Sequence, residues 1–198
     1  MYMKYFPHVL LGIYIILFTV CAINPYTRAI WINENLPVVL FVIFLVFSFK
    51  RFRFSNYSYI IIFIAVITQT IWWYYTFSRV PFDSVSHFFG FERNMFDRVW
   101  HFALWLYAFP IVEYVYRKRV VKRPWMIYIL PIVILLAIAS MYEITERLYT
   151  VYSSWANNAA FLGSQWDRFD PQADMLADWL WALVWVILFR FHQKKKWQ

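Results

Sequence analysis

The sequence predicts an all-α fold: a polytopic membrane bundle of about six transmembrane helices in one integral-membrane domain. The first indication is composition, since 63% of the 198 residues are hydrophobic, 24% are aromatic and only three are glycine. This is too apolar for a soluble domain of this size. The second indication is that long apolar runs recur, and the third is that basic residues gather in alternate connections between these runs.

Six apolar runs define the expected spans, at residues 8–23, 36–49, 58–77, 97–116, 125–142 and 174–191. A helix rises about 1.5 Å per residue, so about 20 residues cross the hydrocarbon core. The second run is the shortest, and it needs Pro37 in its first turn and aromatic flanks to complete a crossing. No repeat or linker divides the chain, so we expect a single domain over residues 1–198.

The basic residues predict the orientation of the bundle. With the N-terminus in the cytoplasm, most of the 19 Lys and Arg residues fall in cytoplasmic segments, as the positive-inside rule requires. We therefore expect both termini in the cytoplasm. The net charge of +8 then follows from topology, so it indicates contact with anionic membrane lipids and not with nucleic acid.

The acidic residues have the opposite distribution, because all except Glu113 fall on the outer side. Glu113 pairs most simply with Arg117, one helical turn later. The other acids include three polar clusters whose spacings of three and four place their members on one side of a helix. The clusters are Asp97 with His101, Glu143 with Glu146, and Asp167 with Asp170, Asp174 and Asp178.

These clusters predict a site for a divalent cation. Several carboxylates and one imidazole, drawn from different helices, give an oxygen-rich ligand set, although the spacing does not identify the metal. Ionisable groups inside spans are costly and usually face a polar interior, and His101 and Asp178 lie deepest. The expected metal ligands are Asp97, His101, Glu143, Asp167 and Asp174.

Further residues of the same outer face suit catalysis at a phosphate. Glu146 or Asp170 is a candidate general base, although Asp170 also fits the N-cap of the last span. Guanidinium groups hold anionic oxygens in a forked geometry. The candidate substrate-binding arginines are Arg93, Arg98, Arg147 and Arg168.

Two other interpretations use the same residues. In the first interpretation, the carboxylates form the entrance of a transporter or ion pathway. Such a pathway needs polar residues toward the cytoplasm, and the inner half of the chain has only Glu113 and, near the middle, Gln69 and Thr68. In the second, ion pairs such as Asp97 with Arg98 only rigidify the outer loops of a structural or sensory protein. Both stay open beside a metal-dependent hydrolase or transferase.

Three segments, "RNMFDRVWHF", "YEITE" and "LGSQWDRFDPQADM", resemble the signature segments of the YjdF-like family of bacterial inner-membrane proteins, a domain of unknown function. The resemblance covers nearly the whole chain and implies a multi-pass protein of the bacterial inner membrane. The matching site residues are Asp97, His101, Glu143, Glu146, Asp167, Asp170 and Asp174. The chain departs from the family pattern at Gln69 and Thr70, where a histidine and an acid are usual, and at Trp166, where a glycine is usual.

A looser similarity links the chain to VanZ-like membrane proteins, which also place an acid, a basic residue and His-Phe at a span entrance. That family is associated with glycopeptide resistance, which implies envelope lipids or cell-wall precursors. Neither resemblance supplies a reaction. We therefore expect an outward-facing site that acts on a lipid or envelope-linked phosphate substrate, and the oligomeric state stays open.

Overall fold

The computed structural model describes residues 5–76, 79–92, 94–152 and 170–196, and every regular element in these ranges is helical. The all-α prediction is thus confirmed for the described part of the chain. Four segments are long and apolar enough to cross a membrane: α1, α2, α3 and residues Met126–Thr145 of α7. In chain order the elements are α1 (Phe6–Ile23), α2 (Arg28–Ser48), α3 (Asn56–Tyr75), α4 (Asp83–Phe88), α5 (Phe96–Leu104), the 3₁₀ turn η2 (Trp105–Tyr107), α6 (Ala108–Arg117), α7 (Met126–Tyr152) and α9 (Asp170–Lys196).

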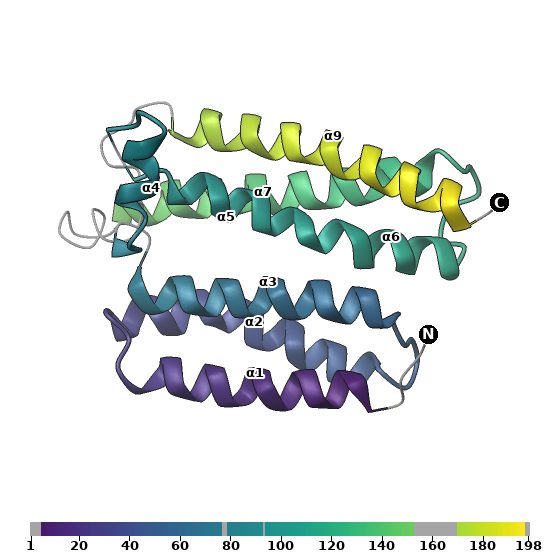
Figure 1. Cartoon of the computed structure of the whole chain (residues 1–198), viewed down its shortest axis with the longest axis horizontal. Helices are drawn as coiled ribbons and strands as arrows, with labels where there is room; N and C mark the ends of the chain where they lie inside the picture. The colour runs from purple at the N-terminus through teal and green to yellow at the C-terminus, as the bar shows by residue number, and fades with distance from the viewer. Residues whose placement is uncertain (1–4, 77–78, 93, 153–169, 197–198) are drawn as a thin grey trace.

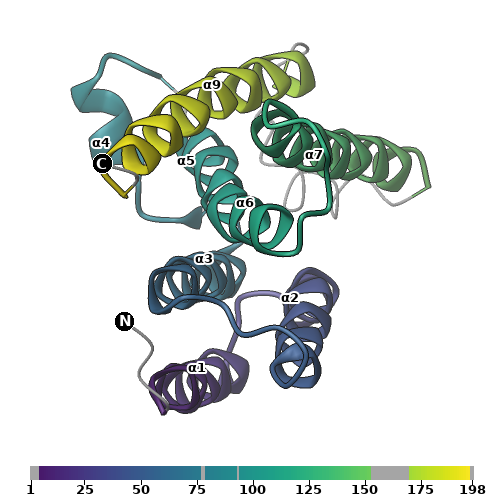
Figure 2. The ribbon, with the colours of Figure 1, turned by 90° about the vertical axis from the view of Figure 1, so that its right-hand side faces the viewer.

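The helices form two groups that run along the same long axis (Figure 1). One group holds α1, α2 and α3, and the other holds α5, α6, α7 and α9, as the end view in Figure 2 shows. Helix α3 packs on α1 and α2 and also contacts α5, η2 and α6, so it joins the groups. The start of α1 and the end of α9 lie at one end of the bundle, and α4 lies at the other (Figure 1).

Helix α2 begins earlier than its apolar run predicts. It starts at Arg28 and not near Leu36, so Pro37 lies inside the helix and not in its first turn. The reason is that the polar residues before the run are buried and bonded: the Asn35 amide donates to the Trp31 carbonyl at 2.9 Å, and Glu34 accepts a hydrogen bond from Tyr142. The helix is thus long enough to span without help from aromatic flanks.

The expected span 97–116 is interrupted, because the turn η2 separates α5 from α6. Pro110 explains the interruption. Proline lacks a backbone N–H, and its ring clashes with the carbonyl four residues earlier, which here belongs to Leu106 within η2. The turn also contains Trp105, whose side chain is fully buried.

A polar cluster around Glu113 joins α6 to the start of α3. Ser55 caps α3 by accepting from the Ser58 N–H at 3.3 Å. The Glu113 carboxylate accepts from the Ser55 N–H at 2.8 Å, from the Ser55 hydroxyl at 2.7 Å and from the Ser58 hydroxyl. Arg117 adds an ion pair at 2.6 Å, as its spacing predicts. Each Glu113 oxygen thus has more than one donor.

Large apolar side chains cover the outer faces of the helices, for example Ile16, Phe47 and Leu180, which are all exposed. Helices that are apolar both inside and outside the bundle are typical of membrane spans. The side chains packed between the helices are often aromatic. One core cluster contains Trp31, Trp72, Trp73 and Trp100. The membrane-protein prediction agrees with this distribution.

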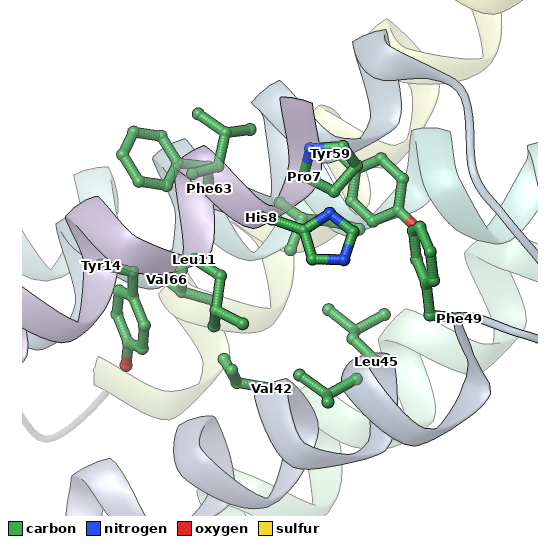
Figure 3. A pocket seen from close by; sticks show the side chains of 13 residues that line it. Pro7, His8, Leu11, Tyr14, Val42, Leu45, Phe49, Tyr59, Phe63 and Val66 are labelled. Carbon is green, nitrogen blue, oxygen red and sulfur yellow. The ribbon is translucent and has the colours of Figure 1, made fainter. Parts of the chain in front are cut away.

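An apolar cavity of about 130 Å³ lies between α1, α2 and α3, near the start of α1 (Figure 3). His8 lies at one end of it, edge-on to the Phe49 ring with a centroid separation of 5.1 Å. The rest of its lining is aliphatic or aromatic. The cavity therefore lacks the convergent polar groups that binding of a charged ligand requires.

Replacing Glu113 should destabilise the bundle. Hydrogen bonds to a charged group contribute about 1.5 to 3 kcal/mol, so we expect Glu113→Ala to lower the free energy of unfolding by about 2 kcal/mol. Reversible unfolding in mixed micelles measures this. The exposed Glu92 supplies the control Glu92→Ala, and an equal, small effect of both changes would contradict the cluster's role in stability.

Candidate functional site

A second polar cluster lies where α5, α7 and α9 meet. His101 comes from α5, Glu143 from α7, and Asp174 and Asp178 from α9. The two aspartates are one helical turn apart and so share a face of α9. Helix α9 packs on both α5 and α7, which brings these faces together.

The His101 imidazole lies at the centre of the cluster. Its Nε2 atom is 3.1 Å from Asp174 Oδ1 and 3.7 Å from Glu143 Oε1. Its Nδ1 atom is 3.1 Å from Asp178 Oδ1. Both ring nitrogens therefore face carboxylate oxygens, and the ring is nearly buried, with 11% of the side chain exposed.

Asp178 fixes the orientation of this imidazole. Its side chain is fully buried, and the Trp105 indole N–H donates to Oδ1 at 3.2 Å. The other oxygen, Oδ2, has no hydrogen-bond partner among the described residues. Since an ionised carboxylate only accepts, the contact with His101 requires a proton on Nδ1.

That proton sets the chemistry of Nε2. A neutral imidazole carries one proton, so with Nδ1–H facing Asp178 the Nε2 lone pair points at the oxygens of Asp174 and Glu143. A lone pair facing carboxylates is repulsive unless a positive charge lies between them. Either a second proton makes His101 an imidazolium, or a cation is held by the three groups.

Several charged groups surround His101. Asp174 also accepts a hydrogen bond from Arg98, on the same Oδ1 atom that faces His101. Among the described residues, three carboxylates, of Glu143, Asp174 and Asp178, thus gather around one imidazole. A divalent cation placed among them would compensate part of this negative charge.

The donor atoms also fit a cation by distance. One donor atom from each of His101, Glu143 and Asp174 lies within 4.8 Å of the others. Ligand atoms about 2.1 Å from a shared metal are about 3.0 to 3.4 Å apart in octahedral or tetrahedral sites, close to the separations from Nε2. A histidine ligand usually donates its other N–H to a carboxylate, as His101 does to Asp178.

Three of the expected metal ligands, His101, Glu143 and Asp174, are brought together, and so is the arginine Arg98. Arg98 forms an ion pair with Asp174, whereas the sequence predicts only that Arg98 binds an anionic substrate.

The other predicted site residues are located by their backbone alone or not at all. Asp97 lies on α5 one turn before His101. Glu146 and Arg147 follow Glu143 on α7, and Asp170 is the first residue of α9. The side chains of these four, and the whole of Arg93, Asp167, Arg168 and Trp166, lie outside the described residues.

Three residues of the site have no role that the sequence predicts. Asp178 was grouped with Asp174 but not assigned a function, and the structure places it behind His101. Trp105 is four residues after His101, a spacing that signals a shared helical face. Glu34 had no usable signal, because it precedes the apolar run that defined the second span.

A cavity of about 140 Å³ opens beside His101, between the two helix groups. Its lining comes from α2, α3, α5 and α7, and includes Glu34, Gln69, Trp100 and Tyr142. The Tyr142 hydroxyl donates to Glu34 Oε2 at 3.0 Å. The site therefore has an adjoining space that is large enough for a small group and is lined by a carboxylate, Glu34, from outside the His101 cluster.

Comparison with known proteins agrees with the resemblance of the three signature segments. Residues 6–195 match the family described as "Predicted membrane protein (DUF2238)". The chain is 32% identical over 173 residues to the inner membrane protein YjdF of Escherichia coli (strain K12). The aligned region covers 86% of this chain and 82% of that protein. No solved structure matches the chain. By the family match and this relative, the chain belongs to the YjdF-like DUF2238 family of predicted membrane proteins.

Proposed function

We propose that this protein binds a divalent cation through His101, Glu143 and Asp174 and acts on a lipid or envelope-linked phosphate at the outer side of the inner membrane. The observation that carries the proposal is the imidazole geometry. Asp178 holds Nδ1, and Nε2 faces two carboxylates from different helices.

The residues of the site divide the chemical work. A bound divalent cation polarises a phosphoryl oxygen and activates water near neutral pH. His101, Glu143 and Asp174 hold the cation, and Asp178 keeps the imidazole in one tautomer. Arg98 contacts Asp174 and lies one turn from His101, so its guanidinium lies beside the proposed cation, where it would also contact an anionic oxygen of the substrate.

The general base comes from the residues that flank the ligands. Glu146 follows Glu143 by three positions on α7, and Asp170 precedes Asp174 by four on α9, so both backbone positions lie on the ligand-bearing faces. The reaction class is hydrolysis or group transfer at a phosphate. Metal ligands and base would then come from three helices.

The topology of the proposal has six spans, with both termini in the cytoplasm. The segment α5–η2–α6 rises about 33 Å, and α9 is 27 residues long, so both have the length to cross the hydrocarbon core. The start of α1 and the end of α9 lie at the same end of the bundle (Figure 1), which agrees with an even number of spans.

A one-sided site explains the polar groups better than a transport pathway. A pathway needs polar groups that continue through the bundle. The buried residues of α3 between Thr70 and Ser58 are Tyr59, Ile62, Ala65 and Val66. Among the described residues, Glu113 at the other end has its own donors and is separated from His101 by this apolar stretch.

Single cysteines test the topology. In a Cys21→Ser background, a membrane-impermeant maleimide should label Glu92→Cys in intact spheroplasts and should label Lys118→Cys only after lysis. Both positions are exposed, so access to the reagent depends on the side of the membrane. Labelling of both from outside would contradict the proposed arrangement.

Metal binding tests the site itself. Protein purified in detergent and stripped with a chelator should take up about one equivalent of Mn²⁺, as measured by electron paramagnetic resonance. His101→Ala and Asp174→Asn should each weaken binding at least about tenfold, because each removes a ligand, and acidification should release the ion by protonating the ligands.

Glu92→Gln is the control for metal binding, since it removes one exposed carboxylate that does not belong to the ligand set. Its Mn²⁺ affinity should equal that of the unchanged protein. If the unchanged protein takes up no Mn²⁺, and His101→Ala only lowers its thermal stability, the ion-pair interpretation is correct and the proposal is wrong.

Asp178→Asn separates orientation from ligation. Loss of a carboxylate behind a ligating histidine typically weakens metal binding about 10- to 100-fold, so we expect a reduced Mn²⁺ affinity with one equivalent still bound at saturation. Trp105→Phe removes the indole donor and some ring volume but no carboxylate, and it should have a smaller effect on Mn²⁺ affinity. Unchanged Mn²⁺ affinity in Asp178→Asn would show that Asp178 does not set the imidazole orientation.

A further inference from the structure

The cavity beside His101 contains a carboxylate that the proposed metal site does not use. Glu34 lines the cavity from α2, and only 8% of the residue is exposed. Its Oε2 atom accepts from Tyr142 at 3.0 Å, while no donor among the described residues reaches Oε1. A buried carboxylate with a single donor is under-satisfied, and such a group is costly in an apolar surrounding.

Three further side chains of the cavity suit a positive charge, although the rest of its lining is largely apolar. Trp100 and Tyr142 line it, with ring centroids 6.1 Å apart and planes at 70°. Aromatic faces attract ammonium groups, and indole does so most strongly. Gln69 lines the cavity from α3 and offers a carbonyl acceptor. A carboxylate, an amide and two aromatic rings form the type of surrounding that binds an organic cation.

Two other occupants fit less well. An alkyl chain would leave Glu34 without the donors it lacks. A second metal ion is disfavoured because the group of potential metal ligands among the described residues consists of His101, Glu143 and Asp174 and does not include Glu34. An ammonium group supplies N–H donors to the carboxylate and presents a cation to the rings.

We propose that this cavity is a subsite for an alkylammonium group, with Glu34 as its counter-ion, next to the cation site. The inference rests on the proposed function, since the cation site takes the phosphate end of the same ligand. His101 lines the cavity and also belongs to the metal cluster, so the two ends of the ligand are a few bonds apart. The ligand class is a phosphoester that carries an amine, either as a zwitterionic lipid headgroup or as a free aminoalkyl phosphate.

Calorimetry with two soluble probes tests the subsite. Mn²⁺-loaded protein should bind phosphoethanolamine about tenfold or more tightly than glycerol 1-phosphate, because a hydrogen bond to a charged group contributes this much. Glu34→Gln should remove the preference and leave Mn²⁺ affinity unchanged, whereas Glu92→Gln should keep both. An unchanged preference in Glu34→Gln, or no preference in the unchanged protein, overturns the proposal.

A second variant covers the case in which Glu34→Gln does not fold. Gln69→Lys places an ammonium group of the protein itself into the cavity, where Glu34 can pair with it. We expect this variant to fold, to bind Mn²⁺ normally and to lose the preference for phosphoethanolamine. Retention of the preference would contradict the assignment of the cavity.

Metal-free protein distinguishes failure of the subsite from failure of the proposed function. Methylammonium alone should bind to the unchanged protein and not to Glu34→Gln, even if Mn²⁺ does not bind. Nanodiscs that contain phosphatidylethanolamine or phosphatidylglycerol, analysed by native mass spectrometry, identify the source. Retention of the amine lipid indicates a headgroup, binding of the soluble probe alone indicates a free phosphate, and absence of both overturns the proposal.

Discussion

The contact of His101 with carboxylates on both sides is the constraint on which the second helix group depends. Charges inside an apolar bundle are tolerated only where they compensate one another. Because Asp174 and Asp178 lie on α9, Glu143 on α7 and His101 on α5, compensation requires these three helices to keep one relative position. The same contacts that make the bundle stable therefore also hold the functional groups in place.

The carboxylates at the two ends of the bundle differ in how well they are satisfied. Glu113 accepts from two serines and an arginine, so its oxygens are occupied by the protein's own donors. Asp178 has an oxygen without a partner among the described residues, and Glu34 is reached there only by Tyr142. A fully satisfied buried carboxylate indicates a structural role, whereas under-satisfied ones beside a cavity point to a ligand.

Helical periodicity was enough to predict part of this arrangement from sequence. The apolar runs predict helices where helices are found, and spacings of three and four predict that His101, Glu143 and Asp174 face the bundle interior. The early start of α2 was not predictable in this way. The added turns contain Glu34, whose partner Tyr142 lies 108 positions away, and no local pattern encodes such a partner. The role of Asp178 depends in the same way on α5 packing against α9.

The break at η2 connects the fold to the site. Pro110 disrupts the regular helix at Leu106, and a proline inside a helix costs about 3 kcal/mol or more. The resulting 3₁₀ turn carries the fully buried Trp105, whose indole N–H reaches Asp178. Asp178 in turn faces Nδ1 of His101, one turn earlier on α5. The distortion is therefore located directly after the turn that carries the imidazole, and the residue that begins it supplies the donor to Asp178.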